Sequence, residues 1–457
     1  MTFISFDFLI LVLVTFLIYY LPFLKKIQTQ VLVTSSVIFY SYDQWRLLPL
    51  LIITIYITIL CLDGIEKGYK YSAAIGVIIN ILILGFFKYK FLICIKCLNL
   101  ESKYEIIKYL LLLPLPIGIS FFIFHNISLI LDFNNKVRVS TSKILLYIVF
   151  FPQLICGPIT RSINFIPQIQ TKFLIDIPWI KCAKLIIVGL FFKLFCANNI
   201  AQVTAQMSPE ISANLGGGDK ILLVYFYSAQ IYSDFFGYSC IALGVGLLFG
   251  YQLPINFNLP YTASSFSDFW KRWHISLSSW LLQYLYIPLG GNRMSKIRTY
   301  ANLMIVMILG GFWHGAALSY AFWGLTHGFF LVVERLFNDF KNIYFKNYYF
   351  SKFQKIIYSF IVFNFISFAW IFFRFQEFEN AFNYIYSISI EPFIFKLPAR
   401  YLISFFYISP IIIQHLLYHK ISIICSNKYL EGFFYGFVLW LSFAEQGADT
   451  QFIYFKF

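Results

Sequence analysis

Long uncharged, apolar runs alternate with short basic segments along most of the 457-residue chain. A helix that crosses a bilayer needs about 20 largely apolar residues, or somewhat fewer when flanking side chains snorkel to the interface. Such runs predict spans at 8–24, 27–42, 47–62, 71–87, 109–131, 144–160, 235–267, 299–333, 356–373 and 401–419, with shorter candidates at 185–208, 221–233 and 432–444. They predict an all-α polytopic membrane protein with roughly 11–13 transmembrane helices.

The two longest uncharged runs, 235–267 and 299–333, exceed what one simple span requires. We expect each to contain a bent helix, a hairpin or a re-entrant segment. Proline and glycine interrupt apolar stretches at 113–118 (LPLPIG), 151–158 (FPQLICGP) and 310–315 (GGFWHG). Broken helices at membrane depth are tolerated only where they are buried in protein or line a cavity, so these breaks predict an internal tunnel or pocket.

The composition excludes a soluble protein. Hydrophobic residues make up 60% of the chain and charged residues 12%, about half the charged fraction of an average soluble protein. The net charge of +15 comes from basic residues that lie mostly between apolar runs, where they set topology and contact anionic lipid headgroups. No basic stripe or nucleic-acid-binding motif accompanies them, so we exclude a nucleic-acid partner.

Basic residues also predict the orientation, because cytoplasmic loops carry an excess of Lys and Arg. Lys25 and Lys26 close the first span and place the N-terminus outside, and no basic segment precedes that span as it would in a cleavable signal. The basic segment 334–355 is expected in the cytoplasm, and the three spans after it leave the C-terminus outside. We expect the chain in the inner (cytoplasmic) membrane.

We expect one integral-membrane domain over 1–457, because no period of about 20–50 residues repeats along the chain. Within it we distinguish N-terminal transmembrane helices at 1–108, a core with the candidate chemistry at 109–335, C-terminal helices at 336–449 and an extracytoplasmic aromatic tail at 450–457. The division follows the placement of the motifs and of the basic segment before the last spans.

The sharpest chemical candidate is His314, near the centre of the uncharged run 299–333 and with glycines on both sides. An ionisable side chain at membrane depth is costly and is by default a candidate functional residue. Adjacent glycines would let a substrate approach the backbone closely. The alternative is a neutral histidine that is hydrogen-bonded between helices. His327 would lie nearly four turns further along an unbroken helix, so the two histidines could not share one small site, and we expect His327 to serve in packing or as a polar contact between helices.

His274 lies in the segment 265–293, which mixes charged side chains with three tryptophans. This pattern predicts an amphipathic helix at the membrane interface, entering the bilayer after Ser279. Aromatic and cationic side chains at an interface are more often anchors than catalysts. Anchoring and a direct chemical role both stay open for His274.

Other polar candidates are few. Asp234 and Asp268 are the carboxylates that could orient His314. The side chains that could line a substrate path are Trp313, Asp268, Arg272, Asp234, Gln153 and Asn258. Cys94 and Cys97 form one C-x-x-C pair without the second pair that zinc needs, so we expect no metal. Phosphate-binding loops, a serine-hydrolase elbow and a zinc-protease motif are absent from the sequence.

The last eight residues, TQFIYFKF at 450–457, contain Tyr454 among phenylalanines. Tyrosine and phenylalanine near a chain end commonly anchor at the membrane interface. Composition alone therefore favours an anchor for Tyr454.

Taken together, these segments resemble the membrane-bound O-acyltransferase family, and within it the bacterial alginate and peptidoglycan O-acetyltransferases. The matching strings are PIGISFFIF at 116–124, FFPQLICGPI at 150–159, YSDFFGYSCIALGVGLLFGYQLPINFNLPY at 232–261, SFSDFWKRWHISLSSWLLQYLYIPLGGNR at 265–293, GGFWHGAALSYAFWG at 310–324 and FIYFKF at 452–457. The chain departs from the pattern at Phe236 and Cys240, where relatives often carry Ser and Asp. No role of that aspartate is carried over.

The resemblance implies tilted helices and re-entrant or interfacial helices around a central tunnel through a thinned part of the membrane. His314 matches the family's catalytic histidine, His274 matches its second marker histidine, and Tyr454 matches a tyrosine that carries the acyl group on the outer side. The implied reaction passes acetyl groups from cytoplasmic acetyl-CoA through Tyr454 to a periplasmic serine acetyltransferase partner, which modifies a cell-envelope glycan.

Peptidoglycan is the favoured glycan, because a chain rich in Ile, Phe, Lys and Tyr and poor in Ala indicates an AT-rich genome. Alginate-type acetylation stays open. D-alanyl transfer to teichoic acid from a carrier protein is a rival reaction in the same fold, and the FIYFKF tail argues against it. A membrane transporter is the rival of another class, disfavoured by the scarcity of intramembrane carboxylates and by the lack of an inverted repeat.

Overall fold

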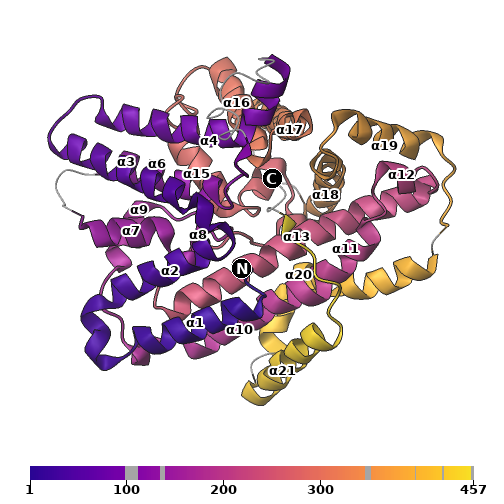
Figure 1. The fold of residues 1–457 in the computed structure, drawn as a ribbon. Helices are drawn as coiled ribbons and strands as arrows, with labels where there is room; N and C mark the ends of the chain where they lie inside the picture. Colours follow the sequence, from indigo (N-terminus) through magenta and orange to yellow (C-terminus); the bar gives the residue numbers. More distant parts are fainter. Residues whose placement is uncertain (98–111, 134–138, 345–350, 397, 425–426, 454–457) are drawn as a thin grey trace. The chain divides into compact units, whose positions relative to one another are not determined.

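The computed structural model describes residues 1–97, 112–133, 139–344, 351–396, 398–424 and 427–453 (Figure 1). Regular secondary structure in this part of the chain is helical throughout. The predicted all-α class is therefore confirmed. The helices form two compact units, and each unit is built from two separate stretches of chain.

The first unit consists of Met1–Ile186 and Ser239–Pro254. Its helices are α1 (Phe6–Tyr19), α2 (Gln28–Gln44), α3 (Leu48–Glu66), α4 (Ser72–Cys97), α6 (Ile119–Asp132), α7 (Thr141–Val149), α8 (Phe151–Leu154) and α9 (Ser162–Phe165). Helix α3 packs against α4 and α6, and α2 packs against α1 and α7 (Figure 1). Thr15 Oγ1 of α1 donates to Ser35 Oγ of α2 at 2.8 Å, the kind of polar contact that joins helices inside membranes.

The second unit consists of Ile187–Tyr238 and Ile255–Phe457. Its helices are α11 (Asn198–Thr204), α12 (Pro209–Ser212), α14 (Phe266–Trp270), α15 (Ile275–Leu281), α16 (Lys296–His314), α17 (Leu318–Tyr344), α18 (Lys352–Arg374), α19 (Phe378–Ile390), α20 (Pro398–Ile424) and α21 (Lys428–Ala444). Two helices, α10 (Trp179–Leu190) and α13 (Gly217–Leu248), contribute residues to both units. Helix α17 packs against α16 and α18, and a π-helical segment, η5 (Phe191–Ala197), contacts α11, α20 and α21.

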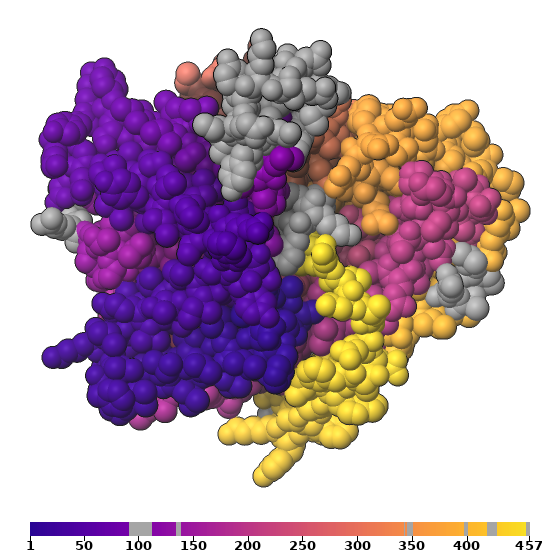
Figure 2. Space-filling model, in the orientation of Figure 1, coloured from indigo at the N-terminus to yellow at the C-terminus, as the bar shows by residue number. Residues whose placement is uncertain are grey.

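Large apolar side chains are exposed on several helices. On α1 they recur at helical spacing, at Phe6, Leu9, Leu13 and Leu17. Helix α21, drawn in yellow, lies on the surface in Figure 2 and exposes Phe433 and Trp440. Soluble proteins rarely expose contiguous apolar surface of this extent, so these faces belong in lipid. The chain is a multi-pass membrane protein.

Four described helical stretches are long and apolar enough to cross a membrane: Pro22–Glu66, Ser72–Lys90, Gly217–Leu248 and Lys352–Arg374. Three shorter apolar helices, Phe6–Tyr19, Ile119–Asp132 and Tyr401–Leu417, accompany them. The first long stretch contains a 3₁₀ turn at Trp45–Leu47 and so holds two of the spans predicted from the sequence. The total of roughly 11–13 spans stays a prediction.

The uncharged run 299–333 contains a hairpin, one of the three arrangements that its length predicted. Helix α16 ends at His314, and α17 begins at Leu318. The basic segment 334–355 begins as helix, because α17 continues to Tyr344. Apolar side chains recur there every three to four residues between charged ones, so an amphipathic helix continues after the uncharged run has ended.

Candidate functional site

His314 is the last residue of α16, and the end of the hairpin buries its side chain, which is 3% exposed. Its ring centroid lies 4.9 Å from that of Trp313, 5.1 Å from that of Trp323 on α17 and 5.0 Å from that of Phe373 on α18. Three helices thus supply an aromatic enclosure that fixes the imidazole and surrounds it with apolar surface.

His274 occupies a strained turn directly before α15. Its φ of 43° and ψ of 52° place a non-glycine residue in the left-handed region, which is uncommon and costs about 1–3 kcal/mol. Asn256 holds the turn from the outside: its main-chain oxygen accepts the Ile275 N–H at 3.0 Å, and its Oδ1 accepts the Ser276 hydroxyl at 2.6 Å. Backbone strain that neighbouring groups maintain in this way clusters at functional sites.

The structure brings His274 and His314 to the same aromatic cluster. The Trp313 ring neighbours both, with centroid distances of 6.0 Å to His274 and 4.9 Å to His314. Phe235 of α13 closes the other side of His274 at 4.6 Å. His274, at 1% exposed, is as inaccessible as His314, so the two candidate histidines share one buried, ring-lined region of the second unit.

The tryptophans around His274 pack inside the protein. Trp273 is 1% exposed, and its ring lies 5.0 Å from that of Trp370 on α18. The prediction of a single helix over 265–293 was wrong, because the segment forms α14 and α15 and the turn at His274 divides them; its placement at the membrane interface stays a prediction. An amphipathic pattern does not distinguish a lipid interface from a protein interior that receives aromatic rings.

His327 lies nearer to His314 than an unbroken helix would place it. The hairpin reverses the chain after His314, and the two rings contact Trp323 with centroid distances of 4.6 Å for His327 and 5.1 Å for His314. The expected separation of His327 from His314 rested on an unbroken helix, which the hairpin does not provide, whereas the packing role expected for His327 agrees with its contact to Trp323. The position of His327 beside Trp323 follows from the break after His314.

The two candidate carboxylates have partners other than His314. Asp268 Oδ1 accepts from Arg272 Nε at 2.8 Å, and the Asn258 N–H donates to the main-chain oxygen of Arg272 at 3.0 Å. Asp234 Oδ1 lies 2.8 Å from Lys193 Nζ in a buried ion pair. Asp268, Arg272 and Asn258 thus form one polar cluster at the start of the His274 turn, and Asp234 belongs to another.

Gln153 lies in the first unit and is fully buried. Its Nε2 donates to the main-chain oxygen of Tyr147 at 2.6 Å, and its Oε1 accepts the Thr160 hydroxyl at 2.5 Å. The structure thus gives Gln153 a role in holding its own loop. A place on a substrate path stays a prediction.

Tyr454 lies outside the described residues, but the residues directly before it are placed. Phe452 is fully buried, and its ring centroid lies 4.1 Å from that of Tyr238 and 5.9 Å from that of Phe235. Phe235 also contacts His274. The tail therefore packs inside the second unit, against a residue of the histidine cluster.

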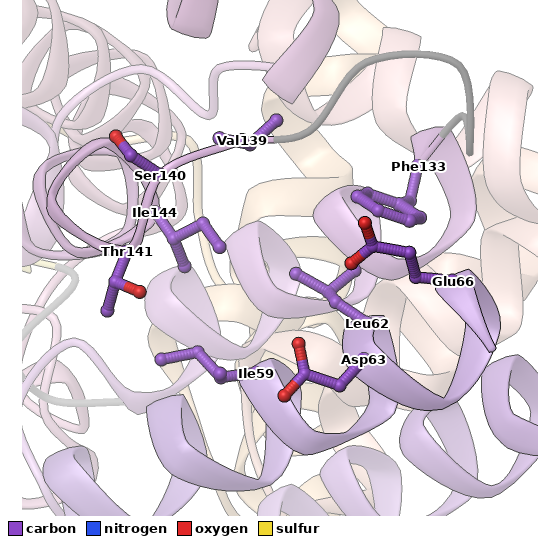
Figure 3. A pocket seen from close by; sticks show the side chains of 9 residues that line it. All are labelled: Ile59, Leu62, Asp63, Glu66, Phe133, Val139, Ser140, Thr141 and Ile144. Carbon is purple, nitrogen blue, oxygen red and sulfur yellow. The ribbon is translucent and has the colours of Figure 1, made fainter.

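A cavity of about 290 Å³ lies in the first unit, at the ends of α3, α6 and α7 (Figure 3). It is lined by Ile59, Leu62, Asp63, Glu66, Phe133, Val139, Ser140, Thr141 and Ile144. None of the predicted site residues is among them. In the part of the chain that the structure describes, no three His, Cys, Asp or Glu side chains are grouped as metal ligands would be.

The sequence that forms these elements matches a known family. The sequence profile described as the membrane-bound O-acyltransferase family matches residues 37–375, more than half of the chain. The chain belongs to this family. The resemblance drawn from the motifs is confirmed, and the matched range includes His274 and His314 but not Tyr454.

Among known proteins, a probable alginate O-acetylase of Pseudomonas aeruginosa is 36% identical over 354 residues, 73% of this chain and 66% of that protein. The peptidoglycan O-acetyltransferase of Helicobacter pylori is 36% identical over 343 residues, 67% of this chain and 64% of that protein. The teichoic acid D-alanyltransferase of Bacillus subtilis is 30% identical over 243 residues, 50% of this chain and 61% of that protein. The match thus spans less than two thirds of each of these relatives.

Proposed function

We propose that this chain is a membrane-bound O-acetyltransferase of the cell envelope that transfers acetyl groups from acetyl-CoA to Tyr454. The observation that carries the proposal is the cluster of His274, Trp313 and His314 with the tail packed against it through Phe235 and Phe452. The family match and the O-acetyltransferases among the relatives support the reaction type.

The chemistry is an acyl exchange between a thioester and a phenol. A phenol has a pKa near 10 and is a weak nucleophile until a base accepts its proton, a role that neutral imidazole can fill. His314 accepts the phenolic proton of Tyr454 as the oxygen attacks the thioester carbonyl carbon. The C–S bond then breaks, and His314 returns the proton to the departing thiolate of coenzyme A. The products are O-acetyl-tyrosine and free coenzyme A.

His274 acts beside this step as a positioning group. Asn256 holds the turn on which His274 lies. Trp313 contacts both His274 and His314, so a shift of His274 changes the position of His314. Trp313 forms one wall of the reacting region. Asp268, Arg272 and Asn258 stabilise the start of the turn, so their replacement acts through His274 and not on the acetyl group.

An extracytoplasmic partner completes the reaction. The serine hydroxyl of that partner attacks the acetyl-tyrosine ester, which forms O-acetyl-serine and restores the phenol of Tyr454. A glycan hydroxyl then attacks the O-acetyl-serine, takes up the acetyl group and releases the serine hydroxyl, with peptidoglycan favoured over alginate-type polysaccharide. The donor is cytoplasmic and the glycan is not, so the proposal places the chain in the inner membrane with both termini outside. The proposal thus divides the work into two reactions: acetyl transfer from acetyl-CoA to Tyr454 at the buried site, and acetyl transfer from Tyr454 to the glycan through the partner.

Peptide mass spectrometry of the purified protein after incubation with acetyl-CoA tests the proposal. Acetyl is expected on Tyr454 in the unchanged protein and is expected to be absent in Tyr454→Phe and His314→Ala. Tyr429→Phe is the matched tyrosine control, since Tyr429 is 89% exposed on α21. His415→Ala is the histidine control, because His415 packs against the rings of Tyr232 and Tyr261, with its Nδ1 2.9 Å from the carbonyl oxygen of Ile411.

The donor decides between the proposal and its rival within the family. Acetyl-CoA is expected to modify Tyr454, and a D-alanyl carrier protein is expected to leave it unmodified. Modification by the carrier protein alone would favour D-alanyl transfer, the reaction named for the relative from Bacillus subtilis. Full acetylation in folded His314→Ala would exclude His314 as the base.

A further inference from the structure

A lysine and an aspartate form an ion pair deep inside the second unit. Lys193 Nζ lies 2.8 Å from Asp234 Oδ1, and the side chains are 0% and 4% exposed. Charges within a membrane protein are costly to bury and usually serve a function. The acetyl transfer described above uses neither side chain.

Both charged groups bind the tail that leads to Tyr454. Lys193 Nζ donates to the main-chain oxygen of Thr450 at 2.8 Å, and Asp234 Oδ2 accepts the N–H of Ile453 at 2.7 Å. Between these two attachments lies the buried ring of Phe452. The ion pair therefore holds the two ends of the four residues that precede Tyr454.

A π-helical turn contacts the chain just before the tail. Phe191–Ala197 is π-helical, and such wider turns leave carbonyl groups free of their regular partners. Leu194 uses its carbonyl oxygen to accept the N–H of Gly447 at 3.2 Å. Position 447 favours glycine, because a Cβ there would lie 2.5 Å from the main chain of Asn198. Close backbone contact thus supports the same placement as the ion pair.

We propose that Lys193 and Asp234 form a charged clamp that fixes Thr450–Ile453 and thereby positions Tyr454 for acetylation. The inference rests on the proposed function, because the tail has this task only if Tyr454 receives the acetyl group. Consecutive Cα atoms are 3.8 Å apart, so fixing the amide of Ile453 confines the residue that follows it. Lys193 and Asp234 are positioning residues, and neither touches the acetyl group.

Two substitutions test the clamp, one in the ion pair and one in the tail. Lys193→Met removes the cation at similar length, and Thr450→Val removes a tail hydroxyl that contacts Lys193 Nζ at 3.3 Å and Asn198 Oδ1 at 2.8 Å without altering any helix. Lys220→Met is the matched control, because Lys220 is 1% exposed and pairs with Glu391 at 2.6 Å in the same unit. It removes a buried lysine from an ion pair that, among the described residues, is formed with Glu391 and not with Thr450–Ile453.

Two measurements on the full-length protein are needed: hydrogen–deuterium exchange of the tail peptide, and the rate of Tyr454 acetylation at a series of acetyl-CoA concentrations. Lys193→Met is expected to raise tail exchange about tenfold and to lower the maximal acetylation rate about 100-fold at unchanged KM, the cost of misplacing a reacting group by about 1 Å. Thr450→Val is expected to shift both values in the same direction and less. Lys220→Met is expected to lower thermal stability and to leave both values within about twofold.

Normal acetylation and normal tail exchange in Thr450→Val and in folded Lys193→Met would overturn the clamp. If Lys193→Met does not fold, Thr450→Val decides alone. Equal losses in Lys220→Met and Lys193→Met would show a general stability effect and would also overturn it. Absence of acetyl on Tyr454 in the unchanged protein is a separate result: it refutes the proposed function, and tail exchange in the variants then still reports whether the ion pair holds the tail.

Discussion

Replacing Gly311 by alanine perturbs the packing that holds His314. Gly311 lies three residues before His314 on α16, and a Cβ there would come closer than 3.0 Å to the main-chain oxygen of Tyr320 on α17. The obstructing atom belongs to the backbone, so no side-chain rotation relieves the clash. The two helices of the hairpin must separate instead.

The size of the effect follows from the geometry. Ordinary contact begins at 3.4 Å, so the hairpin must open by about 1 Å at this point. Overpacking of this kind costs about 1–3 kcal/mol, from which the better helix propensity of alanine recovers up to about 1 kcal/mol. A displacement of about 1 Å at a reacting group lowers a rate about 100-fold. When both are expressed as free energies, the loss of acetylation rate is therefore expected to exceed the loss of unfolding free energy.

Gly310→Ala is the matched control, because the Cβ at position 310 would lie 3.4 Å from the flexible Cδ1 of Leu281 and meet no backbone atom. The assay is acetylation of Tyr454 together with thermal unfolding in the same detergent. Gly310→Ala is expected to keep the activity and thermal midpoint of the unchanged protein. Equal acetylation rates in Gly311→Ala and Gly310→Ala would refute the reasoning.

Two further predictions concern the groups around the His274 turn. Asn256→Ala removes the acceptor of the Ser276 hydroxyl but keeps the main-chain oxygen that accepts the Ile275 N–H. It is expected to cost about 1–2 kcal/mol in thermal or chemical unfolding and to lower acetylation; unchanged values would exclude the Asn256 side chain as a support of the turn. Glu334 accepts the main-chain N–H of Phe266 at 2.5 Å, and burial raises the pKa of its carboxyl. Because the carboxyl pKa is raised in the folded state, the stability of the protein falls as pH rises above the ordinary value of 4.5. Glu334→Gln is therefore expected to flatten the dependence of the thermal midpoint on pH between that value and neutrality. A thermal midpoint that rises with pH in the unchanged protein, and not in the variant, would contradict this.

The helical class and the site histidine follow from local features of the sequence. Uncharged runs set by membrane thickness predict helices without any knowledge of tertiary contacts. His314 stands out because it is an ionisable residue inside such a run. The same reasoning allowed a hairpin in 299–333 and marked an interruption at 310–315, but it positioned His327 as if the helix were unbroken. The break after His314 brings His327 beside Trp323.

The contacts of Asp234 depend on tertiary packing that no local pattern shows. Its partners Lys193 and Ile453 come from distant parts of the chain. Lys193 carried a usable signal, since it is a lysine inside the apolar run 185–208, and the rule that singled out His314 applies to it equally. The burial of Trp273 had no such signal, because an interface and an aromatic interior favour the same residues.

A single-turnover experiment tests the central claim most directly, by measuring the coenzyme A thiol released and the acetyl group found on Tyr454 in the same sample. The account predicts one thiol for each acetylated Tyr454 in the unchanged protein, and neither product in folded His314→Ala or Tyr454→Phe. Thiol release with no acetyl on Tyr454, or acetyl retained by the protein in Tyr454→Phe, would contradict it.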